Sequence, residues 1–152
     1  MDRLNELPGI SFTGYRKITR SLDSQSVDNW LHVTWDGLLA LDHFARSSAD
    51  GGTSGNFLSW CKSEASSAFP FPVAKVAMRE SDTVGRNAKL RGERMLPVPE
   101  TVDADWRVFM QAHLKIGGGN TIAPRLHFYD DYPRSGKVYV GYLDPHLRNP
   151  LT

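Results

Sequence analysis

The clearest pattern in the N-terminal half is a run of apolar residues at three- and four-residue steps. Such spacing places one side of an α-helix against the protein interior. Asp23 and Ser24 can cap the start of this helix, and the Gly- and Ser-rich stretch 47–55 ends it. Trp35, Leu39 and Phe44 widen the apolar face. We therefore predict a helix from about 25 to 47 that packs against a broad surface such as a sheet.

Apolar and polar residues alternate in three segments of the last third of the chain, at about 107–116, 124–131 and 137–143. A period of two is typical of strands that bury one face. The intervening stretches are rich in Gly, Asn, Pro and Ser, which favour turns. The sequence therefore predicts an antiparallel β-meander of three strands. Together with the helix packed on one face, it predicts a single α+β domain over residues 1–152.

The register of the meander follows if each hairpin folds symmetrically about its loop. His113 then faces His127, with Gly141 as the next neighbour, and Tyr129 faces Tyr139. The face predicted to pack on the helix is apolar and comprises Val108, Met110, Ala112, Leu114, Leu126, Phe128, Val138, Val140 and Tyr142. The opposite face carries His, Tyr, Gln, Lys and Arg side chains, and we expect it to be solvated.

The chain between the helix and the meander gives weaker signals. Residues 57–61 are predicted to form a short helix, while 73–78 and 96–98 are predicted to add short edge strands. The charged segment 79–94 is predicted to be either a helical turn or an exposed loop.

Composition narrows the class of protein. The chain has 152 residues, 40% hydrophobic and 23% charged, which is ordinary for one globular domain. Its 18 basic and 17 acidic residues give a net charge of +1, so there is no bulk basic excess of the kind that marks a dedicated nucleic-acid binder. The single cysteine, Cys61, excludes an internal disulfide and predicts a reducing, cytoplasmic setting. No apolar run reaches the ~20 residues of a membrane span.

The paired histidines of the meander are the main chemical candidate. Directly opposed residues in an antiparallel pair have Cβ atoms about 4.5–5.5 Å apart, so His113 and His127 could share a divalent metal ion. Asp131 or His146 would supply a third ligand. Alternatively, one histidine acts as an acid or base beside Tyr129. A solvated sheet face without chemistry is the remaining interpretation.

A basic segment is the second candidate. It contains Arg79, Arg86, Lys89, Arg91 and Arg94 among several acidic residues. These side chains could bind nucleic-acid phosphates. A solvated loop with local ion pairs explains the same composition.

Three classes of function remain from the sequence alone. The near-neutral charge, the expected exposed aromatics and the absence of a complete catalytic set favour a non-catalytic interaction or accessory module of a larger intracellular assembly, whose partner is another protein. The first alternative is a metal-dependent hydrolase or phosphodiesterase that uses the paired histidines. The second alternative is a nucleic-acid-binding accessory domain that uses the basic segment.

Overall fold

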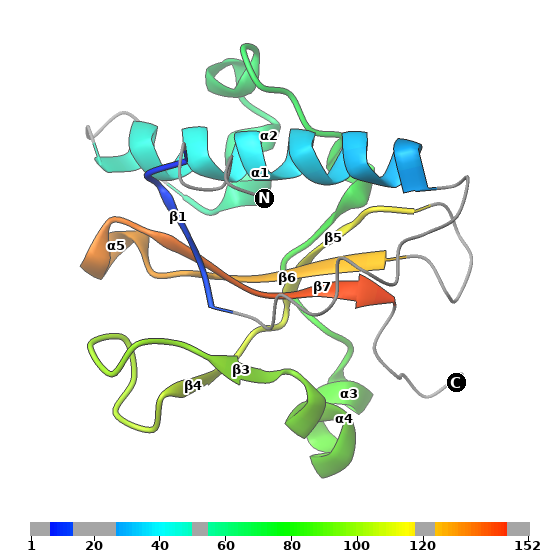
Figure 1. The fold of residues 1–152 in the computed structure, drawn as a ribbon, viewed down its shortest axis with the longest axis vertical. Helices are drawn as coiled ribbons and strands as arrows, with labels where there is room; N and C mark the ends of the chain where they lie inside the picture. Colours follow the sequence, from blue (N-terminus) through cyan, green and yellow to red (C-terminus); the bar gives the residue numbers. More distant parts are fainter. Residues whose placement is uncertain (1–6, 14–26, 50–54, 118–123, 146–152) are drawn as a thin grey trace.

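A computed structural model describes residues 7–13, 27–49, 55–117 and 124–145 and shows an α+β fold (Figure 1). A five-stranded sheet has one long helix on one side, and a two-stranded sheet with two short helices on the other (Figure 1). In chain order the elements are β1 (Ile10–Phe12), α1 (Val27–Ala49), α2 (Phe57–Cys61), the 3₁₀ helices η3 (Glu64–Ser66) and η4 (Val73–Lys75), β2 (Val76–Ala77), α3 (Asp82–Arg86), α4 (Ala88–Glu93), β3 (Met95–Pro97), β4 (Arg107–Phe109), β5 (Ala112–Lys115), β6 (Pro124–Asp130), α5 (Tyr132–Ser135) and β7 (Val138–Pro145).

The main sheet has the strand order β1-β7-β6-β5-β2. Strand β1 pairs in parallel with β7, and the other neighbours are antiparallel. The predicted meander is thus confirmed in β5, β6 and β7, and the predicted helix in α1. Of the strand predicted at 73–78, only the edge strand β2 is confirmed, because Val73–Lys75 form the 3₁₀ helix η4. Strand β1 was not predicted, because its three residues are too few to show a period.

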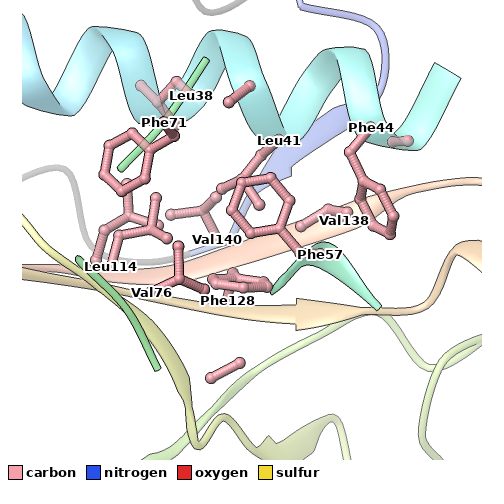
Figure 2. Close-up of a cluster of buried hydrophobic side chains, with 14 of the residues drawn as sticks. Leu38, Leu41, Phe44, Phe57, Phe71, Val76, Leu114, Phe128, Val138 and Val140 are labelled. Atoms are coloured by element: carbon pink, nitrogen blue, oxygen red, sulfur yellow. The ribbon is translucent and has the colours of Figure 1, made fainter. Parts of the chain in front are cut away.

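The main core lies between α1 and the sheet. Figure 2 shows Leu41 and Phe44 of α1 above Val138, Val140 and Phe128 of the strands. All five side chains are fully buried. Burial of each side chain of this size stabilises the fold by about 1.5–3 kcal/mol before entropy is counted. In the described part of the chain, no helix is both long and apolar enough to cross a membrane.

The predicted strand at 107–116 is in fact two strands in two different sheets. Strand β5 belongs to the main sheet, whereas β4 pairs with β3 in the separate two-stranded sheet. The chain passes from one sheet to the other at Met110 and Gln111. Val108 and Met110 therefore pack in a second core, with Val98, Val102 and Tyr139. The prediction that Val108 and Met110 pack on the helix is wrong, because a continuous alternation does not reveal where a strand leaves its sheet.

The predicted register is confirmed for His113 opposite His127 and for Tyr129 opposite Tyr139. Between these pairs, an irregularity at His127 and Phe128 shifts the pairing of β6 with β7. His127 consequently pairs with Tyr142 rather than Gly141, and Tyr142 turns to the histidine side of the sheet instead of the helix side. A symmetric hairpin contains no such bulge, and this part of the predicted register is wrong.

The second layer changes the environment of the histidines. The β3–β4 sheet, α3 and α4 lie on the side of the main sheet away from α1 (Figure 1). His113 is 9% exposed and His127 only 1% exposed. The face expected to be solvated is therefore covered at the histidines, so the pair occupies a partly desolvated space between two layers.

Candidate metal centre

Three potential metal ligands meet on the covered side of the main sheet. Glu80, His113 and His127 each offer one ligand atom, and these atoms all lie within 4.8 Å of one another; no other residue in the described ranges joins the group. His113 and His127 are cross-strand partners on β5 and β6. Glu80 follows β2, whose Ala77 pairs with His113. Three neighbouring strands thus bring the cluster together, and the fold needs no long loop to build it.

Backbone carbonyl groups orient both imidazole rings. His113 Nδ1 lies 2.9 Å from the carbonyl oxygen of Gln111, and His127 Nδ1 lies 2.8 Å from that of Met110. Met110 and Gln111 connect β4 to β5, so their carbonyl groups lie between the two strands, and the histidine side chains supply them with hydrogen-bond donors. Donation by Nδ1–H leaves the lone pair of each neutral ring on Nε2. Such outer hydrogen bonds are typical of histidines that bind metals.

The two rings lie close together. Their centroids are 4.9 Å apart and their planes are inclined by 30°. The Tyr142 ring packs nearly perpendicular to His127, with centroids 5.9 Å apart. Packing on two sides limits the rotation of His127 and fixes the direction in which its nitrogen atoms point.

A buried arginine holds the carboxylate of the cluster. Arg94 is 2% exposed, and its Nε donates to Glu80 Oε1 over 2.7 Å. Its Nη1 also donates to the carbonyl of Leu90 in α4, over 2.9 Å. The same Glu80 oxygen lies 3.7 Å from His113 Nδ1. Arg94 therefore positions the carboxylate beside the histidines and connects α4 to the cluster.

The surroundings favour a neutral imidazole at His113. Burial lowers the pKa of His113, and the positive charges of Arg125 and Lys115 act in the same direction. The bond to the Gln111 carbonyl and the charge of Glu80 oppose this change, but burial is the largest contribution. Only the neutral ring can bind a metal ion, so the same desolvation keeps this ligand in its binding form near neutral pH.

The donor set matches that of a divalent transition metal. Two imidazoles and one carboxylate occur in catalytic zinc sites and in the facial triads of iron enzymes. Ligand atoms at bond lengths of about 2.0–2.1 Å around a tetrahedral ion lie about 3.4 Å apart. The separations here, at most 4.8 Å, are wider than that, so the side chains would have to move closer together around a tetrahedral ion. Three protein ligands leave at least one coordination position for water or a substrate.

The other residues predicted for this site do not join the cluster. Asp131 is 3% exposed and lies at the start of α5, away from the three ligands. Tyr129 packs against the second core. His146 lies outside the described residues. Sequence analysis missed Glu80, although an acidic residue two positions after a predicted edge strand was a usable signal.

The basic segment has a different structure from the predicted contact surface. It forms α3 and α4, so the helical alternative is confirmed. Arg79, Arg86, Lys89 and Arg91 are exposed. Arg94 is buried and paired with Glu80, so it is not on the exposed surface that the predicted contact with nucleic acid needs, and it lies beside the candidate metal ligands instead.

Comparison of the chain with protein-family models, with curated proteins and with solved structures finds no match in any of the three. The chemistry of the cluster therefore has to be inferred from its own residues.

Proposed function

We propose that this protein is a metal-dependent hydrolase that binds a divalent transition-metal ion through Glu80, His113 and His127. The observation that carries the proposal is the meeting of three ligand atoms within 4.8 Å, two of them on the neighbouring strands β5 and β6 and the third on Glu80, just after β2. The two Nδ1 hydrogen bonds and the Arg94–Glu80 ion pair add the outer support that metal ligands need. Zinc is the ion that this donor set suits best.

The proposed chemistry is the addition of water across a polar bond. Glu80, His113 and His127 would hold the ion, and a bound divalent ion would supply an activated water at neutral pH. Hydrolysis would consume one water: its oxygen would go to the electrophilic atom of the substrate and a proton to the leaving group, with no redox partner. Arg94 holds the Glu80 carboxylate, and the carbonyls of Met110 and Gln111 hold the two imidazoles.

The interaction module favoured by the sequence receives less support from the described surface. Of the four tryptophans only Trp106 is exposed there, at 56%. The other exposed large hydrophobic side chains, Leu31 and Val73, lie on different elements of the fold. No specific observation on these residues favours a protein partner, whereas the cluster gives a definite chemical hypothesis.

The test is metal binding by the whole chain. Protein stripped with a chelator is titrated with zinc by calorimetry, and bound metal is counted by elemental analysis after gel filtration. We expect one equivalent in the wild type and at least a tenfold weaker affinity in His113→Gln and in His127→Gln, as for loss of one ligand. His32→Gln is the matched control, because His32 is exposed on α1.

Hydrolysis is then assayed with chromogenic phosphate and carboxylate esters, with and without the metal. Activity that appears with the metal and is lost in both cluster variants supports the proposal. Failure of the wild type to bind zinc, manganese, iron or nickel more tightly than the His113→Gln/His127→Gln double variant overturns it. Circular dichroism establishes that each variant is folded.

A further inference from the structure

A pocket of about 400 Å³ adjoins the metal cluster. Two residues connect them. Glu80 lines the pocket and is one of the three ligands, and Gln111 lines the pocket while its carbonyl oxygen holds His113. The backbone N–H of Glu80 also points at Gln111 Oε1, over 3.4 Å. The pocket therefore opens beside the carboxylate of the cluster, and its volume is in the usual range for small-molecule sites.

Three arginines line this pocket from different elements. Arg79 precedes α3, Arg86 ends α3 and Arg91 lies in α4. Arg91 stacks on Phe109, with its guanidinium carbon 4.1 Å from the ring centroid. Within the described ranges, neither Arg79 nor Arg86 has a carboxylate within 4.0 Å, so no ion pair neutralises them there. Their guanidinium groups are thus able to bind an incoming ligand.

The balance of charge at the pocket is positive. Its acidic lining residues are Glu80 and Asp82, and Glu80 is already paired with Arg94. A metal centre with one carboxylate ligand adds further positive charge when it is loaded. An anionic ligand is therefore the chemical class that this region binds most favourably.

Arginine suits a phosphate group in particular. Its planar guanidinium donates two parallel hydrogen bonds to phosphate oxygens, and such charge-assisted bonds are about twice as strong as neutral ones. A pocket favours a compact phosphate over a nucleic-acid strand, since a strand needs a basic surface that continues along several phosphates. Here Arg94 is buried and Lys89 does not line the pocket, so three of the five basic side chains of the segment gather at the pocket.

We infer that the pocket lined by Arg79, Arg86 and Arg91 binds the phosphate group of a small phosphorylated substrate and presents that substrate to the metal cluster. This inference rests on the proposed hydrolase function and names its substrate class. Phosphate binding itself needs only the arginines, so it can be measured in the absence of metal.

The experiment measures the affinity of chelator-treated protein for inorganic phosphate and for para-nitrophenyl phosphate by calorimetry. Wild type is compared with the Arg79→Gln/Arg86→Gln variant. The Lys89→Gln/Arg107→Gln variant is the control: it removes the same two charges from exposed positions outside the pocket. We expect the pocket variant to bind phosphate at least about tenfold more weakly, and the control to change by less than about twofold. Zinc stoichiometry should stay at the wild-type value in both.

Two results overturn the inference. One is the absence of phosphate binding in the wild type. An equal loss of phosphate affinity in both double variants has the same consequence, because it would show diffuse charge attraction only. The other is binding of a fluorescent single-stranded oligonucleotide that is tighter than phosphate binding, depends strongly on salt and is not displaced by phosphate. This result would assign the segment to nucleic acid. The proposed metal centre fails separately: phosphate binding that survives while zinc binding is absent rejects the hydrolase and leaves a metal-independent anion site.

Discussion

Replacing Gly141 by alanine tests how tightly the second layer is packed on the histidine side of the sheet. A Cβ atom at this position would lie 2.6 Å from Met110 Sδ, 2.9 Å from Met110 Cε and 2.9 Å from Leu96 Cβ. All three separations are shorter than real Cβ contacts. Met110 is fully buried, so its thioether has no solvent to move into. Leu96 Cβ moves only with the backbone of β3, which is paired with β4.

The expected cost follows from this overpacking. Insertion of one methyl group into a well-packed core typically destabilises a protein by about 1–3 kcal/mol. We expect Gly141→Ala to reach this range, because part of the β3–β4 layer has to move away from the main sheet. Since the Met110 carbonyl holds His127 Nδ1, the same movement should also weaken the proposed zinc binding.

Urea unfolding of metal-free protein, followed by tryptophan fluorescence, measures the change in the free energy of unfolding. Gly92→Ala is the matched control, because it adds the same methyl group in α4 where nothing lies within 4 Å. Alanine favours a helix over glycine by about 0.5–1 kcal/mol, so this control should be stabilised. If the free energy of unfolding of Gly141→Ala lies within about 0.5 kcal/mol of the wild-type value, the packing described for the second layer is refuted.

Two further predictions concern the titration and reactivity of buried groups. Burial and the charge of Asp131 raise the pKa of Asp130, so the stability that Asp130 contributes is present below its ordinary pKa and is lost as the pH rises through the raised value. The Asp130→Asn variant keeps an acceptor for the Tyr132 N–H. It should therefore raise the free energy of unfolding at pH 7 and leave it unchanged at pH 3. A lower free energy of unfolding at pH 7 would contradict this. Burial raises the pKa of the Cys61 thiol to about 12, so at pH 8 a thiol reagent should label native protein about a hundredfold or more slower than urea-unfolded protein. Equal labelling rates would show that the thiol is accessible and ionised.

Local patterns determined the elements that are long or regular. The spacing of Trp30, Leu38 and Leu41 gave a helix close to Val27–Ala49, because one face of a helix repeats every 3.6 residues. The alternation in β6 and β7, with short loops, was sufficient for an antiparallel pairing. The opposition of His113 and His127 also followed, because register in the first hairpin depends only on its loop and on which side faces the core.

The environment of the histidines could not be read in the same way. Tyr, Gln, Lys and His on one side of a strand look the same whether water or a second layer covers them. The cover here is β3 and β4, and β4 departs from the strand that contains His113 at Met110 and Gln111 without any interruption of the alternation. Glu80 and Arg94 are 33 and 19 residues away from His113 in sequence, and only the packing of β2 and α4 brings them to it.

The sequence by itself therefore determined the fold class, the long helix, the meander and the pairing of two histidines, all of which depend on interactions between near neighbours in the chain. Only the tertiary structure decided that the pair is buried, that Glu80 completes it and that three arginines surround a pocket beside it. The physical reason is that burial and the approach of distant charges depend on how separate elements pack, and the local pattern of apolar and polar residues does not show which segment covers which face.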